Sequence, residues 1–77
     1  MKSNEVNSSL IGRRVKAMSL GEMVTGTITK IDNVGSSVCV FFKFDTPQNW
    51  GGQIYREGSA WARKADEFGS LHHMELI

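Results

Sequence analysis

Residues Met23–Asp45 read MVTGTITKIDNVGSSVCVFFKFD, and this stretch decides the fold. Side chains of a β-strand alternate between its two faces. In the run Val38–Phe44 every second side chain is a large apolar one, which predicts a strand with that face in a core. The run Val24–Lys30 places threonines on the face that we expect to meet water, and Asn33–Ser37 has the residues of a turn. The stretch therefore predicts a β-hairpin, with Val24, Ile28, Val38, Val40, Phe42 and Phe44 in the core.

Two residues depart from the pattern of the first of these strands. Gly26 has no side chain to pack, so it indicates a sharp bend or the close approach of another backbone, as at the corner of a small barrel. Ile31 interrupts the alternation, so we expect a bulge or the end of the strand there.

Length and composition limit the class of protein. A chain of 77 residues is one domain with a marginal core. Its single cysteine cannot form an internal disulfide, which is typical of a reducing cytoplasm. No apolar run is long enough for a signal sequence or a membrane span, so we expect a cytoplasmic protein without a membrane partner. The net charge of +1 provides no overall attraction to nucleic acid.

The segments around the hairpin are shorter. Residues 1–9 are polar and without periodicity, so they predict a disordered tail, and residues 10–77 form the single domain. Arg13–Met18 predicts a first strand, with Val15 facing the core. The stretch Asp45–Gln53 is rich in Pro and Gly and predicts the longest loop.

The C-terminal third predicts the remaining elements. Gln53–Glu57 is a short strand or part of the preceding loop, and Ser59–Lys64 is a strand. Ala65–Gly69 is predicted to form a single helical turn. His72–Ile77 is the last strand, and it adds Met74 and Leu76 to the predicted core.

About five short strands with glycine-rich turns, and one helical turn before the last strand, are typical of a small closed or partly open β-barrel. Gly12-Arg13-Arg14-Val15 followed by Gly26-Thr27-Ile28 resembles the first two strands of SH3-like barrels, the shape of Tudor and KOW-type modules. The resemblance covers roughly the first half of the chain. It implies an all-β SH3-like barrel whose loops at one rim form a binding groove.

Three aromatic residues lie in or beside the predicted loop: Trp50, Tyr55 and Trp61. Flat aromatic faces can stack on bases, hold a methylated cation or receive a proline-rich ligand. Long ordered loops on a rigid scaffold are usually functional. The alternative is that Trp61 fills the core and Trp50 covers the barrel mouth. The predicted binding site consists of Trp50, Gln53, Tyr55, Arg56, Trp61 and Arg63.

A local positive cluster precedes the hairpin: Arg13, Arg14 and Lys16. Together with Lys30 and Arg63 it could contact phosphates. The alternative is an ordinary solvated surface, in which the nearby acidic residues balance these charges.

The sequence predicts no metal site, no cofactor and no catalytic residue. His72 and His73 are adjacent, so in a strand they point to opposite faces, and Cys39 has no second cysteine to complete a ligand set. Cys39 with a histidine also lacks the third group that a nucleophile pair needs.

Gln53-Ile54-Tyr55 is similar to the Gln-Ile-Tyr of plasmid-borne type II dihydrofolate reductases, which are SH3-like barrels of nearly this length. The resemblance implies a homotetramer whose central pore binds folate and NADPH through these residues. The family's pore lysine falls on Ala17 here, Gly52 replaces the valine before the glutamine, and Arg56–His73 intervenes where the family's chain ends.

Two classes of function follow. The first is a small non-catalytic binding module that engages nucleic acid or a protein through an aromatic and basic rim, of the kind found among accessory proteins of phages and mobile elements. The second is an oligomer like the type II reductases. Phe41 and Cys39, opposite the core face, also predict self-association. The alternative to self-association is that the C-terminal segment covers Phe41.

Overall fold

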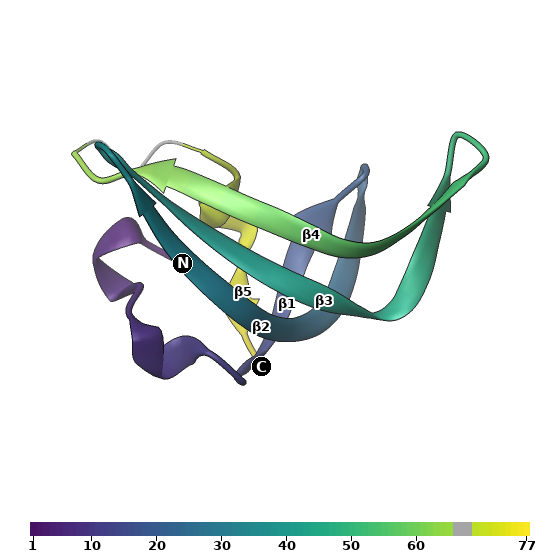
Figure 1. Cartoon of the computed structure of the whole chain (residues 1–77), viewed down its shortest axis with the longest axis horizontal. Coiled ribbons are helices and arrows are strands. Elements are labelled where there is room, and N and C mark those ends of the chain that lie inside the picture. Colours follow the sequence, from purple (N-terminus) through teal and green to yellow (C-terminus); the bar gives the residue numbers. More distant parts are fainter. Residues whose placement is uncertain (66–68) are drawn as a thin grey trace.

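The computed structural model describes residues 1–65 and 69–77. These residues form one antiparallel sheet of five strands, joined and preceded by short 3-10 turns (Figure 1). The strands are β1 (Arg14–Ser19), β2 (Glu22–Val34), β3 (Ser37–Trp50), β4 (Gln53–Arg63) and β5 (Glu75–Leu76), and the 3-10 turns are η1 (Ser3–Glu5), η2 (Ser8–Leu10) and η3 (Ser70–His73).

The strand order is β4-β3-β2-β1-β5. The first four strands follow one another as a meander, and the chain then returns so that β5 pairs with β1, with Val15 opposite Leu76. The prediction of an all-β protein with five strands and a helical turn before the last one is confirmed. The turn is η3, whereas the predicted turn at Ala65–Gly69 falls largely on residues 66–68, which lie outside the described residues.

Hydrogen bonds do not close the sheet into a barrel. Within the described residues, the edge strands β4 and β5 do not pair with each other. The sheet is strongly curved instead, because its long strands β2 and β3 bend along their length, as Figure 1 shows. The sequence predicted a small barrel, but the described strands form a curved sheet that is not closed into one.

The core lies on the concave side of this curved sheet. Phe42 and Phe44 pack edge to face there, with ring centroids 5.4 Å apart. Leu71 of η3 and Met74 after it are fully buried and cover the open side. Leu76 was predicted to be in the core, but 38% of its surface is exposed, because β5 is only two residues long and lies at an edge. Among the described residues, the buried apolar ones are Leu10, Val15, Ala17, Val24, Ile28, Val38, Val40, Phe42, Phe44, Ala60, Ala62, Leu71 and Met74.

Gly26 allows two backbones to approach closely. It lies opposite Phe44, and a Cβ atom on it would lie 2.3 Å from the carbonyl oxygen of Lys43. The predicted close approach is confirmed. The predicted irregularity of β2 also exists, but the register shifts between Ile28 and Lys30 and not at Ile31.

The ends of the chain differ from the sequence prediction. Residues 1–9, predicted as a disordered tail, form η1 and η2, and the amino group of Met1 donates hydrogen bonds to the carbonyl oxygens of Leu71 (3.2 Å) and Met74 (2.5 Å). The last strand was predicted to begin at His72. It begins at Glu75, because the preceding residues complete the 3-10 turn that buries Leu71.

Candidate functional site

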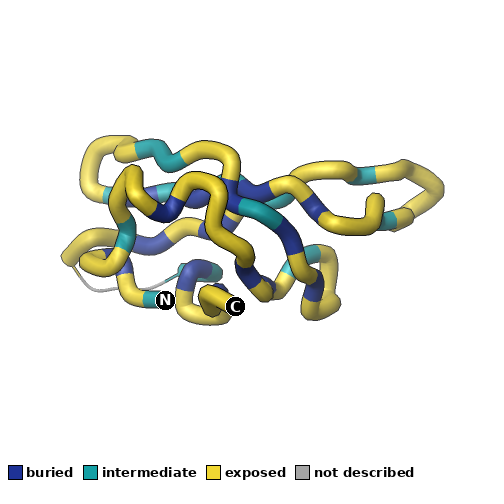
Figure 2. The backbone as a smooth tube through the Cα atoms, turned by 90° about the horizontal axis from the view of Figure 1, so that it is seen from below, coloured by how far each residue is buried: buried dark blue, intermediate teal, exposed yellow. Residues whose placement is uncertain are grey.

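The stretch predicted as a long loop is a projecting hairpin. β3 continues to Trp50 and β4 begins at Gln53, so only Gly51 and Gly52 form the turn. Both have positive φ, 60° and 80°, as a two-residue turn between twisted strands requires. The prediction of a loop was wrong here, although a Gly-Gly pair between two short runs is itself a hairpin signal. We call residues 48–55 the arm, and Figure 2 shows this end of the molecule extending beyond the body, almost entirely exposed.

A large bulge sets the direction of the arm. The pairing of β3 with β4 passes from Lys43–Glu57 directly to Gln48–Tyr55. Four residues of β3, 44–47, therefore lie opposite the single residue Arg56. A bulge bends its strand, and in Figure 1 the hairpin turns away from the sheet at this point. Pro47 is tolerated in a strand here because the ladder is interrupted.

An ionic contact ties the bulge to the neighbouring strands. The two terminal guanidinium nitrogens of Arg14 donate to the carboxylate of Asp45, at 2.7 and 2.6 Å, and the Thr25 hydroxyl donates to the same group at 2.7 Å. Such bidentate contacts restrict orientation as well as adding energy. The Thr25 hydrogen bond and then the Arg14 contact lower the pKa of Asp45. The base of the arm is thus held against β1 and β2.

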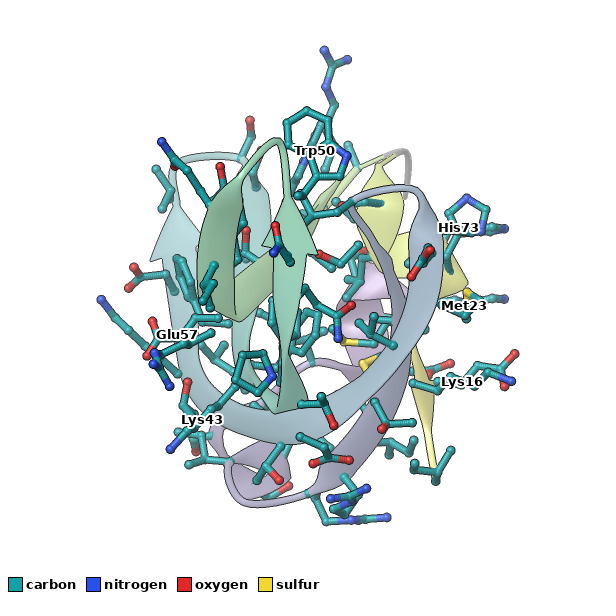
Figure 3. The ribbon with its side chains drawn as sticks, turned by 90° about the vertical axis from the view of Figure 1, so that its right-hand side faces the viewer. Lys16, Met23, Lys43, Trp50, Glu57 and His73 are labelled. Atoms are coloured by element: carbon teal, nitrogen blue, oxygen red, sulfur yellow. The ribbon has the colours of Figure 1, made fainter. Side chains whose placement is uncertain are left out.

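The two faces of the arm carry different side chains. Trp50 lies opposite Gln53, and Tyr55 follows on the same face, where its hydroxyl lies 3.3 Å from Oε1 of Gln53. Tyr55 packs against the core and anchors that face. Trp50 is 58% exposed near the tip, where Figure 3 shows its ring at the end of the hairpin. Ile54 is 63% exposed on the opposite face.

The remaining residues of the predicted site lie elsewhere. Arg56 is opposite the bulge, next to the arm. Trp61 is six residues beyond Tyr55 along β4, which corresponds to roughly 20 Å. It is 46% exposed and lies opposite Cys39, on the sheet face away from the core, so it does not fill the core. Arg63 is near it at the end of β4. The structure therefore divides the predicted site between the arm and the sheet.

The predicted basic cluster is not a uniform positive surface. Arg14 and Lys16 share one face of β1, but Arg14 is paired with Asp45. Arg13 precedes the strand, and its backbone is hydrogen bonded to Leu10 and Ile28. In the same sheet, Lys43 of β3 lies opposite Glu57 of β4, as Figure 3 shows. Positive and negative side chains alternate over this part of the molecule.

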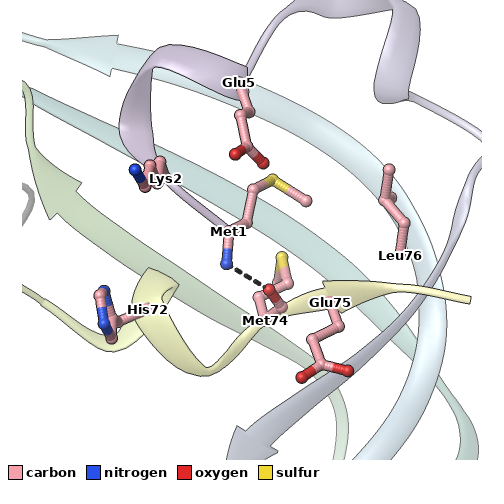
Figure 4. Close-up of a pocket in the computed structure, with 7 residues that line it drawn as sticks. All are labelled: Met1, Lys2, Glu5, His72, Met74, Glu75 and Leu76. Atoms are coloured by element: carbon pink, nitrogen blue, oxygen red, sulfur yellow. Dashed lines mark hydrogen bonds between the residues drawn. The ribbon is translucent and has the colours of Figure 1, made fainter.

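A cavity of about 390 Å³ lies where the two ends of the chain meet (Figure 4). The Met1 amino group on its wall is already hydrogen bonded to backbone carbonyl oxygens. Among the described residues no three His, Cys, Asp or Glu side chains are placed to hold a metal ion. No helix of the described chain is both long and apolar enough to cross a bilayer. The lining residues are Met1, Lys2, Glu5, His72, Met74, Glu75 and Leu76.

Comparison with known proteins places the chain in a family. Residues 1–76 match the family described as a domain of unknown function, DUF7258, and the chain belongs to it. No curated protein and no solved structure matches the chain.

Proposed function

We propose that the protein is a small non-catalytic binding module that holds a partner protein on its arm. The observation that carries the proposal is the exposure of Trp50 (58%) and Ile54 (63%) on a hairpin that projects beyond the core. Large apolar side chains that are exposed on a rigidly positioned hairpin are typical anchors of protein interfaces. The Arg14–Asp45 contact and the packing of Tyr55 hold the base of the arm, which reduces the entropy lost on binding.

The chemistry of the arm favours a protein over nucleic acid. Residues 48–55 include no charged side chain, so the arm supplies no phosphate contact of its own. Trp50 could stack on a base, but the aliphatic Ile54 could not. The amides of Gln48, Asn49 and Gln53 surround these two side chains with hydrogen-bonding groups, as the polar rim of a protein interface does.

The sheet supports a related proposal about shape. We infer that the protein is an open form of the SH3-like barrel. The order β4-β3-β2-β1-β5, the 3-10 turn η3 before the last strand and the contact of β5 with β1 all support this inference. A curved sheet of this kind provides a rigid base for a projecting hairpin, as a binding scaffold requires.

The experiment uses a photocrosslinking amino acid at Gln53, on the arm, and separately at Thr29, an exposed position on β2. In host cells we expect adducts with proteins other than this chain itself from position 53 and not from position 29. Trp50→Ala should reduce the adducts strongly, because the loss of an interface anchor costs at least ~2 kcal/mol, roughly 30-fold in affinity. Because Trp50 is largely exposed, the variant should keep its fold, which circular dichroism can verify.

A nucleic-acid partner predicts a different result. If the partner is a protein, as proposed, fluorescence titration with single-stranded and duplex oligonucleotides at two salt concentrations should detect no binding. Binding that weakens with salt and with Trp50→Ala would contradict the proposed protein partner. Equal adducts from positions 53 and 29 would contradict the arm as the site.

The resemblance to type II dihydrofolate reductases stays a prediction with its own test. In the structure Ile54 points away from the face that Gln53 and Tyr55 share, so the three side chains do not form one surface of a single chain. A tetramer in sedimentation together with oxidation of NADPH by dihydrofolate would favour the reductase, and either result alone would not.

A further inference from the structure

The sheet has a second exposed surface, opposite the core, which we call the outer face. It consists of two central rows across β2, β3 and β4. Phe41 lies between Lys30 and Ser59 in one row, and Cys39 lies between Asp32 and Trp61 in the next. Glu57 and Arg63 lie on β4 at the two ends of the face.

The centre of the outer face is apolar and only partly covered. Phe41 and Cys39 are half-buried, and Trp61 is 46% exposed. Burial raises the pKa of the Cys39 thiol, so at neutral pH it contributes to the face as a small apolar group. The described C-terminal residues, 69–77, follow the edges and the core side of the sheet: Ser70 accepts a hydrogen bond from the Trp61 backbone N–H, Leu71 and Met74 are in the core, and β5 pairs with β1. They do not cover Phe41, which was the alternative to self-association.

The charges around this centre have an internal symmetry. Lys30 and Asp32 lie on either side of Ile31 on β2, with 3.3 Å between Nζ and Oδ2. The Lys30 ammonium also lies 5.5 Å from the centroid of the Phe41 ring. On β4, Glu57 and Arg63 lie three residues on either side of Ala60. Ile31 and Ala60 both belong to the row that passes through Val40. A twofold rotation about this row therefore brings Lys30 to the position of Asp32, and Glu57 to the position of Arg63.

We propose that the outer face binds a second copy of the chain, about a twofold axis that runs across the strands along the row of Val40. This operation places each strand over the same strand of the second copy, running in the opposite direction. Lys30 then faces Asp32 of the second copy, and Glu57 faces Arg63 of the second copy, and each pair occurs twice. Cys39 faces Phe41 of the second copy at the centre. An isologous contact requires such self-complementarity.

The size of the face predicts the strength of the dimer. From residue 57 to residue 63 the face extends roughly 20 Å along the strands, and three strands extend roughly 10–15 Å across. This footprint is smaller than the ~800 Å² that each partner buries in a standard interface. We therefore expect a weak dimer, with a dissociation constant on the order of 10–1,000 μM.

The test is sedimentation equilibrium of the full chain from ~10 μM to ~1 mM, a range that brackets this constant. Lys30→Asp should place two carboxylates opposite each other and weaken the dimer at least ~10-fold, and Asp32→Lys should do the same with two ammonium groups. The double variant Lys30→Asp/Asp32→Lys restores both pairs and should recover the parent constant within a factor of ~3. Trp50→Ala on the arm is the matched control and should leave the constant unchanged.

Alkylation of Cys39, the only cysteine, provides a second measurement. Its rate with iodoacetamide should fall as the concentration of the parent protein rises, and it should not fall for the single charge reversals. A monomer at every concentration would overturn the proposal, as would a dimer that tolerates both single reversals. Failure of the double variant to recover dimerisation would overturn the proposed axis, provided that circular dichroism shows it to be folded.

Discussion

Replacing Gly26 by alanine should destabilise the fold through a contact between two backbones. The added Cβ would lie 2.3 Å from the carbonyl oxygen of Lys43 and 3.0 Å from the ring of Phe42. Neither group can turn away, because the carbonyl belongs to β3 and the ring is fully buried. β2 and β3 would have to separate, which weakens the ladder where Gly26 lies opposite Phe44.

The expected cost combines three terms. Overpacking costs ~1–3 kcal/mol, and a lost ladder hydrogen bond costs ~1 kcal/mol. The smaller entropy of an unfolded chain with alanine offsets ~0.4–1 kcal/mol. The net loss of ~1–3.6 kcal/mol should lower the melting temperature by roughly 4–29 °C, since 1 kcal/mol corresponds to ~4–8 °C in a domain of this size.

Thermal melting followed by circular dichroism measures this effect, with Thr27→Ala as the matched control. Thr27 is the next residue of β2, and its side chain lies on the outer face, so its loss should cost no more than ~1 kcal/mol. If Gly26→Ala melted at or above the temperature of Thr27→Ala, the close approach of the two strands would not limit stability and the reasoning would be refuted.

Two further perturbations follow from the core and from the base of the arm. Phe42→Ala removes the largest fully buried side chain among the described residues and should cost ~3–5 kcal/mol, so urea denaturation should find the variant mostly unfolded; a midpoint close to that of the parent would remove Phe42 from the core. The pKa of Asp45 is lowered from 3.8 in the folded state by Thr25 and Arg14, so its contribution to stability is present above that pH and is lost as the pH falls through the folded pKa. Asp45→Asn should therefore reduce the difference between melting temperatures at about pH 6 and about pH 3, and an unchanged difference would mean that the contact with Arg14 is absent in solution.

Local sequence patterns determined the class of the fold and most of its core. The alternation in Val38–Phe44 predicts a strand and its buried face, because the side-chain period is a property of the strand itself. Gly26 predicted a close backbone contact for a similarly local reason, since only the absence of Cβ allows it. A short strand offers too few residues for the alternation to show which face is buried. Leu76 is apolar and was predicted to be in the core, but it lies on a two-residue edge strand and is partly exposed.

Only the tertiary structure decided the form of the candidate site. Pro47 and Gly51-Gly52 are local signals for a loop, but pairing between Gln48 and Tyr55 continues the ladder across a bulge and makes a hairpin of it. The sequence left open whether Trp50 is a contact residue or a lid over the barrel mouth; in the structure it is exposed, and its place on an arm was not predicted.

The position of Trp61 shows why the sequence alone could not decide on which face of the sheet a site residue lies. The face on which it lies depends on its register with Cys39 of β3, and a shift of one residue would have turned it into the core. The same register sets Lys30, Asp32, Glu57 and Arg63 around one row of the sheet. A strand's own sequence specifies which side chains share a face, but pairing between strands specifies which face is buried and what lies beside it.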